Sequence, residues 1–183
     1  MKKPLIATLV LLAAGSAVFA ANTTWQEPEM PKPTAEHKAL HQTVGNWEGT
    51  ITMFMPGVPE VPMPASEVVT AFGPFWVQAE FTSQMGPMEY KGTGSFGYDP
   101  MSEMHTGTWI DNMGSYLSVM KGKMDKETNT LTMKWKAPNS EGKMAPHRNE
   151  TVRTKDAYTA TFYTDGVKTM VIDMKRVADA GTK

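Results

Sequence analysis

The chain has 183 residues and contains no cysteine. Disulfide bonds, thiolate catalysis, thiolate metal sites and lipidation at cysteine are therefore excluded. Leucine is also scarce, because beyond residue 20 the chain has only Leu40, Leu117 and Leu131, against fifteen methionines. Methionine is unbranched and polarizable, so it fills irregular space and adapts to ligands of varied shape. These absences predict a fold that depends on its packed core alone, with methionine in the place that leucine usually takes.

The first twenty residues have the features of an export signal. Two lysines near the start precede an apolar run over residues 5–14, and residues 18–20 (V-F-A) form a small-residue cleavage pattern. No basic cluster follows the apolar run, so we expect cleavage after Ala20 rather than a retained membrane anchor. The sequence therefore predicts an exported protein, periplasmic or secreted, with no stable membrane insertion after the signal is removed.

The charge of the mature chain excludes one large class of partner. Removing twenty of the 183 residues leaves 163, with 16 basic and 19 acidic side chains, because the signal contains Lys2 and Lys3. A nucleic-acid-binding protein needs a basic face, and the scattered basic residues here do not form one, so we expect no nucleic-acid partner. The remaining length suits a single domain with a sizeable core.

The N-terminal part of the mature chain has no strand pattern. Residues 21–33 contain three prolines and no periodicity, which predicts a flexible lead-in. Thr34 can cap a short helix that runs to about Thr43, because apolar and histidine side chains recur there with helical spacing. Gly45 is expected to end this helix.

From Trp47 onward the hydrophobic period changes to two, which is typical of β-strands. Turn residues separate the runs, and Asp165-Gly166 is a strong signal for a two-residue hairpin. About ten strands with no interspersed helix predict an all-β, antiparallel up-and-down barrel over residues 34–177, since closure removes the exposed edges of a meander. Residues 178–183 are expected to form a disordered tail. After the first strand, the expected strands cover residues 66–72, 75–84, 88–98, 104–111, 115–124, 129–136, 147–154, 157–164 and 167–176.

Several short motifs point to one family. They are residues 37–47 (H-K-A-L-H-Q-T-V-G-N-W), Pro56-Gly57, residues 97–99 (G-Y-D) and residues 108–113 (T-W-I-D-N-M). Together they resemble the bacterial domain-of-unknown-function family numbered 1579, over most of residues 34–176. The resemblance implies a lipocalin-like, or calycin-like, β-barrel, and it implies no activity.

Residues at the two ends of the barrel sequence also resemble calycins in general. In those barrels an arginine stacks over the tryptophan of a Gly-x-Trp motif and closes the floor. The corresponding residues here are Gly45, Trp47 and Arg176. Stacking of this kind stabilises a protein by about 1–2 kcal/mol when it is desolvated. The resemblance therefore implies a structural floor made by these three residues.

Alternation along the strands suggests which side chains face a cavity. Residues of one parity share a face of a strand. The odd face of 104–111, the even face of 75–82 and the even face of 88–98 each combine aromatic and polar groups, which is typical of a small-molecule site. The alternative is that the acids face water, because Asp and Glu are seldom buried unless paired. The cavity candidates are Glu80, Tyr90, His105, Trp109 and Asp111.

No catalytic motif is present in the sequence. None of the serines after the signal lies in a Gly-x-Ser-x-Gly elbow, and there is no phosphate loop or dinucleotide fingerprint. The leading hypothesis is binding of a small apolar or amphipathic molecule inside the barrel. The second is an enzyme that uses Glu80, Asp111 or His105 as acid or base and Tyr90 as a hydrogen-bond donor. A filled barrel with a purely structural role is a further alternative.

Metal and haem binding complete the alternatives, although we expect no metal and no cofactor. His37 and His41 lie one helical turn apart, but no third ligand is evident. Methionine pairs such as Met120 and Met124 could bind Cu(I), yet their spacing is also that of buried strand positions. Calycin-like barrels that bind haem use a histidine in the cavity, and His105 and His147 are the strand-borne candidates.

Overall fold

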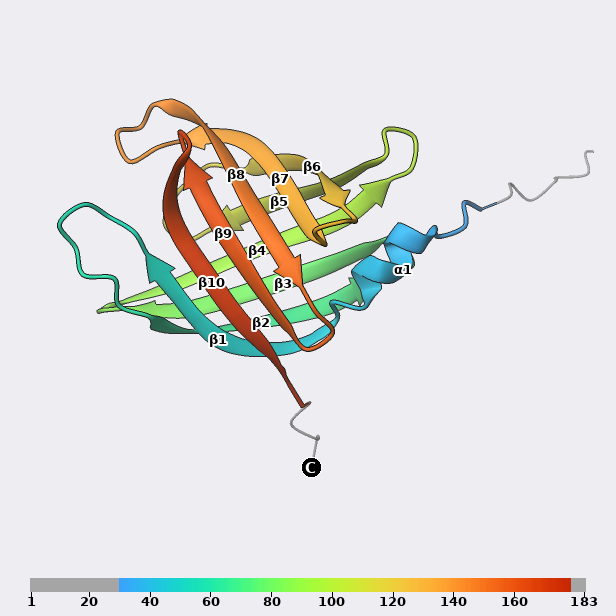
Figure 1. The fold of residues 1–183 in the computed structure, drawn as a ribbon, viewed down its shortest axis with the longest axis horizontal. Coiled ribbons are helices and arrows are strands. Elements are labelled where there is room, and N and C mark those ends of the chain that lie inside the picture. The colour runs from blue at the N-terminus through green and yellow to red at the C-terminus, as the bar shows by residue number, and fades with distance from the viewer. Residues whose placement is uncertain (1–29, 179–183) are drawn as a thin grey trace, which may run out of the picture. The chain divides into compact units, whose positions relative to one another are not determined.

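The computed structural model describes residues 30–178, so the predicted signal, most of the lead-in and most of the tail lie outside the described residues. This part of the chain forms one short helix followed by ten strands (Figure 1). The elements are α1 (Ala35–His41), β1 (Gly45–Met53), β2 (Met63–Phe72), β3 (Trp76–Met85), β4 (Met88–Asp99), β5 (Met104–Asp111), β6 (Ser118–Asp125), β7 (Thr130–Pro138), β8 (Met144–Arg153), β9 (Ala157–Thr164) and β10 (Val167–Val177).

The strands form a closed antiparallel barrel in which each strand pairs with its neighbours in sequence. β1 closes it, because Trp47 pairs with Glu67 on β2 and with Arg176 on β10. The predicted fold, an all-β up-and-down barrel of ten strands after a short helix, is confirmed. Closure leaves no strand edge free to pair with another chain. Among residues 30–178, no helix has the length and apolar character needed to cross a bilayer.

Helix α1 lies against β3 and β4 at one end of the barrel (Figure 1). Its first turn is fixed by Thr34, whose backbone N–H donates to Nδ1 of His37 at 3.0 Å, in the position that Glu or Gln usually takes in a capping box. His37 is buried edge-on against Phe75 and Tyr98. His37, one of the two histidines that the helical spacing singled out as possible ligands, therefore serves as a cap and a packing residue.

Some element boundaries differ from the predicted ones. Gly45 does not end the helix, which stops at His41; it begins β1 with a φ of 138°, a backbone conformation that favours glycine. β8 begins three residues earlier than expected, because β7 continues to Pro138 and pairs with Met144. Pro138 and Pro146 both lie within these paired strands.

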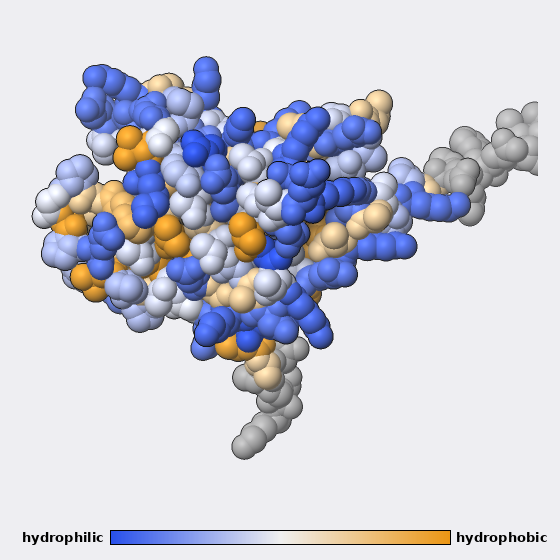
Figure 2. Space-filling view, viewed as in Figure 1, coloured by the Kyte–Doolittle hydropathy of each residue, from blue (hydrophilic) through white to orange (hydrophobic). Residues whose placement is uncertain are grey.

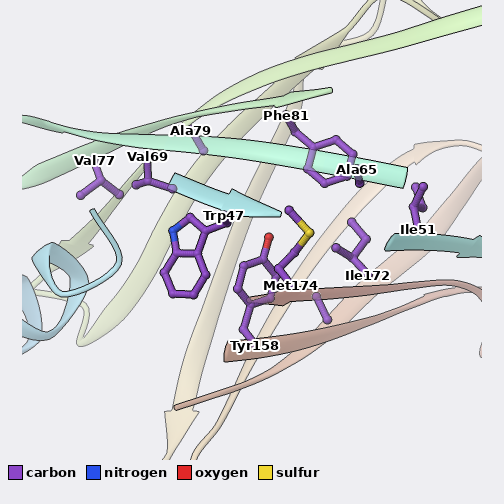
Figure 3. Packing of buried hydrophobic residues seen from close by; sticks show 11 residues of the cluster. Trp47, Ile51, Ala65, Val69, Val77, Ala79, Phe81, Tyr158, Ile172 and Met174 are labelled. Atoms are coloured by element: carbon purple, nitrogen blue, oxygen red, sulfur yellow. The ribbon is translucent and has the colours of Figure 1, made fainter. Parts of the chain in front are cut away.

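The side chains of one parity on each strand point into the barrel. On β1 these include Trp47 and Ile51, and on β3 they are Val77, Ala79 and Phe81, each at most 3% exposed (Figure 3). The expectation that the even face of 75–82 lines the interior is therefore wrong. The apolar odd residues of β3 occupy the interior, and Trp76 lies on the outer surface. Its ring covers Gly97, where an added Cβ would lie 2.5 Å from the indole.

Candidate functional site

The barrel is hollow. It encloses a cavity of about 610 Å³ that is lined by side chains from all ten strands and from α1. We call the end where β1 begins and β10 ends the floor, and the opposite end, with the β1–β2 loop, the mouth. Seven methionines contribute to the cavity wall and give it adaptable apolar surface. They are Met53, Met85, Met113, Met120, Met124, Met133 and Met170.

A chain of hydrogen bonds lies in the cavity wall near the mouth. Nε1 of Trp109 donates to Oη of Tyr90 at 3.0 Å, and this hydroxyl donates to Oδ2 of Asp111 at 3.4 Å. Burial, followed by the nearby Asp111, raises the pKa of Tyr90 to about 12. The phenol therefore stays protonated at neutral pH and can act as a hydrogen-bond donor. The structure brings these three sequence-predicted residues together in the cavity.

Two glycines on β4 make room for the Trp109 ring. A Cβ added at Gly92 would lie 2.3 Å from the indole, and one at Gly94 would lie 2.7 Å from it. Such contacts are far closer than side-chain atoms tolerate, so a larger residue at either position would displace Trp109. The Gly-x-Gly pattern in the strand thus marks a close approach of backbone and ring.

His105 also lines the cavity, next to Tyr98, with ring centroids 5.1 Å apart. Burial lowers the pKa of its imidazole and so favours the neutral form, although the charge of Glu36 acts in the opposite direction. His147 lines the cavity on β8, but both of its ring nitrogens are engaged, one with Ala137 O at 3.2 Å and one with Thr164 Oγ1 at 3.0 Å. Of the two strand-borne histidines, His105 is therefore the one better placed to contact a bound molecule.

Glu80 does not belong to this site. It lies on the exposed face of β3, because its parity is that of Trp76 and not that of the buried Val77 and Ala79. The prediction that Glu80 lines the cavity is therefore wrong, because the residues of the other parity on β3 point inward. An acid–base role for Glu80 inside the barrel is excluded by the same geometry.

The floor is built around Trp47, which is 1% exposed. Its Nε1 donates to Thr43 O at 3.0 Å, and Cζ of Arg176 lies 4.2 Å from the ring centroid. Arg176 also donates through Nη1 to Val44 O at 2.6 Å and through Nη2 to Gln42 O at 2.7 Å. Gly45 leaves space for this guanidinium, since an added Cβ would lie 2.5 Å from Nη1. Arg176 therefore joins the last strand to the segment that precedes the first.

A cluster of polar side chains near the floor was not predicted from the sequence. Oη of Tyr158 donates to Oε2 of Glu67 at 2.8 Å across the barrel, and Cζ of Arg153 lies 4.2 Å from the Tyr158 ring centroid. Burial raises the pKa of Glu67 and lowers that of Arg153. Burial and the neighbouring Glu67 raise the pKa of Tyr158. All three side chains line the cavity.

Strand β8 supplies a polar stripe to the cavity wall. Its inward residues His147, Asn149, Thr151 and Arg153 all line the cavity. The β3 residues that line it, by contrast, are all apolar. The available sequence signal was the run H-R-N-E-T-V-R, which has no large apolar residue on the face that turns inward. A strand of a closed barrel must point one face inward, so such a run predicts polar groups in the lumen.

The described residues contain no group of three or more His, Asp or Glu side chains placed to bind a metal ion. The two methionines considered as possible copper ligands differ in environment: Met120 is buried, whereas Met124 is exposed. Both residues contribute to the cavity wall, and Met124 also reaches the surface.

The fold is shared with solved structures of low sequence identity. A crystal structure of Rv2717c from M. tuberculosis matches with a TM-score of 0.61 and 10% identity, covering 80% of this chain and 100% of that one. The S-type phycobiliprotein lyase CPES from Guillardia theta matches with a TM-score of 0.57 and 12% identity, covering 80% and 94%. At these identities the likeness establishes the barrel fold alone.

The sequence comparison is more specific. No protein with a curated description matches the chain. A family model matches residues 32–177, which include the helix and all ten strands. The resemblance seen in the short motifs is thereby confirmed, and the chain belongs to the family described as "Protein of unknown function (DUF1579)".

Proposed function

We propose that this protein binds a small apolar or amphipathic molecule inside its barrel. The observation that carries the proposal is the cavity of about 610 Å³. Ligand-binding pockets occupy about 300–1,000 Å³, are mostly apolar and contain a few placed polar groups. The methionine-rich wall, the Trp109–Tyr90–Asp111 chain and the polar stripe of β8 match that description. A barrel with a purely structural role has no need for such a space.

The surface around the mouth supports this proposal. Figure 2 shows a largely hydrophilic face on which hydrophobic residues gather towards the left, where the β1–β2 loop lies in Figure 1. Large apolar side chains of the two loops at this end are exposed, which suits the entry of an apolar molecule. They include Met55, Val58 and Val61 from the β1–β2 loop and Met113 and Leu117 from the β5–β6 loop.

Filling the cavity should abolish binding. In Ala79→Phe the new ring would project into the lumen, because Ala79 is 2% exposed and lines the cavity. We expect the affinity for the neutral fluorescent probe N-phenylnaphthylamine to fall by about tenfold or more. Gln78→Phe, on the exposed face of the same strand, should leave the affinity unchanged. Fluorescence titration of the three proteins measures this, and equal binding by all three would place the probe outside the barrel.

Fewer residues could serve as acid or base in an enzyme than the sequence suggested. Without Glu80, the titratable groups within one hydrogen-bond chain at the mouth are Tyr90 and Asp111. The raised pKa of Tyr90 makes it a donor that can orient a bound molecule rather than a base at neutral pH. This observation favours binding over acid–base catalysis.

We further propose that the protein is exported and that the carrier acts in the periplasm or outside the cell. The support is the charged, apolar and small-residue pattern of residues 1–20. Expressed in a Gram-negative host, the full chain should yield a mature protein that begins at Ala21 and fractionates with the periplasm or the medium. Intact-mass measurement of the fractions checks this; an uncleaved chain in the cytoplasm would overturn it.

A further inference from the structure

Arg153 and Arg176 lie near the same tryptophan but differ in their bonding. Cζ of Arg176 is 4.2 Å from the Trp47 ring centroid and Cζ of Arg153 is 5.1 Å from it. Arg176 donates hydrogen bonds to three backbone carbonyls, so its N–H groups are occupied by the protein itself. Nη1 of Arg153, in contrast, is buried and has no hydrogen-bond partner among residues 30–178. Only Arg153 of the two lines the cavity.

The aromatic contacts of Arg153 do not satisfy its hydrogen-bonding groups. Cation–π contacts with Tyr158 and Trp47 offset part of the charge, but a guanidinium still presents five N–H donors in one plane. Within residues 30–178, Arg153 forms no ion pair with a carboxylate. Leaving a buried cation without an anion is costly, because the guanidinium stays protonated. The cavity beside it has room for an anionic group.

Glu67 is the nearest candidate within the protein, but it is engaged elsewhere. Its Oε2 accepts a hydrogen bond from the hydroxyl of Tyr158, and burial raises its pKa despite the opposing effects of this hydrogen bond and of the Arg153 charge. The charge of Arg153 is therefore incompletely neutralised by the surrounding side chains. Asn149 lies four residues before Arg153 on β8, nearer the mouth, and its buried Oδ1 also lacks a partner within the described part of the chain. The polar stripe thus contains two unused hydrogen-bonding groups on the same wall.

We propose that the molecule bound in the barrel is an amphiphile with a carboxylate head, and that Arg153 binds this head near the floor. The inference rests on the proposed binding function. Carboxylates match the fork of a guanidinium and form bidentate, charge-assisted hydrogen bonds with it. With the head at Arg153, the apolar tail extends towards the mouth along Met120, Met133 and Phe162, which line the cavity.

Three probes with the same tail and different heads test the assignment: dodecanoate, dodecanol and dodecylammonium. A hydrogen-bonded pair with a charged group changes affinity by about tenfold to hundredfold. Calorimetric titration of the wild type should therefore show dodecanoate binding at least about tenfold tighter than dodecanol, and dodecylammonium binding weakest. Arg153→Met should remove this preference while retaining the affinity for dodecanol.

Matched variants separate head recognition from loss of fold. Arg148→Met removes the same charge from the outward face of the same strand, so it should keep the preference for dodecanoate. Glu67→Gln removes the competing carboxylate and should bind dodecanoate at least as tightly as the wild type. If Arg153→Met does not fold, the wild-type series and Glu67→Gln still decide the question.

The outcomes distinguish the two proposals. Equal affinity of the wild type for dodecanoate and dodecanol, a preference that survives in Arg153→Met, or a preference lost in Glu67→Gln would overturn the carboxylate assignment while leaving a binding barrel. If none of the three probes binds, the proposed binding function fails along with it.

Discussion

Replacing Trp47 by alanine should lower the free energy of unfolding by about 3–5 kcal/mol, the range for truncating a buried aromatic side chain to alanine. Trp47 is 1% exposed and packs edge-on against Tyr158, with ring centroids 5.4 Å apart (Figure 3). Its removal would also delete the hydrogen bond to Thr43 O and the ring beneath Arg176. Urea denaturation followed by circular dichroism measures the change.

Trp76→Ala is the matched control for this substitution. Trp76 is 39% exposed on the outer surface of β3, so truncating it removes less buried apolar area than truncating Trp47. We expect a change of about 1 kcal/mol or less, as for most surface substitutions. A similar loss of stability in the two variants would mean that Trp47 is not the residue that closes the floor.

Arg176→Met should destabilise the protein by about 2–4 kcal/mol, because hydrogen bonds from a charged group contribute about 1.5–3 kcal/mol each. Methionine keeps an unbranched apolar stem near Trp47 but cannot donate to Val44 O or Gln42 O. The Val44 carbonyl is part-buried, so water replaces the lost donor only in part. The effect would appear as a lower urea midpoint with an unchanged m-value.

Arg148→Met provides the comparison for Arg176→Met. Arg148 pairs with Glu150 at 3.0 Å near the surface, and pairs of this kind contribute about 0–1 kcal/mol. A loss at Arg148 as large as that at Arg176 would show that the effect comes from the charge alone. A small loss at Arg148 and a large one at Arg176 would show that the bonds to the segment before β1 hold the floor together.

The barrel could be predicted from the sequence because its signals are local. A period of two in the hydrophobic pattern follows from the geometry of an extended backbone, and Gly, Pro, Asn and Asp mark the turns through their own conformational preferences. The helix and the ten strands can therefore be located one after another along the sequence. Errors arose at boundaries such as Met144, where pairing across a hairpin extends a strand past prolines.

The inward face of a strand was harder to predict. On β5 the odd residues point inward as expected, because His105, Gly107 and Trp109 contrast with polar or exposed neighbours. On β3 the large aromatic Trp76 suggested the wrong parity. Its outward position depends on Gly97, a residue of the neighbouring strand that leaves room for the ring. The correct parity was nevertheless present in the sequence, because Val77, Ala79 and Phe81 alternate with polar residues, and the error came from giving one tryptophan more weight than this alternation.

The sequence by itself determined the all-β meander, the absence of thiol chemistry, the methionine-rich interior and the residues at the floor. Only the tertiary structure decided that the lumen is hollow, that Glu80 faces outward and that Arg153, Glu67 and Tyr158 meet inside it. Tyr158 and Glu67 are 91 residues apart, and nothing local links them. The physical reason is that periodicity is set by the backbone within a strand, whereas contacts across a lumen exist only after the sheet has closed on itself.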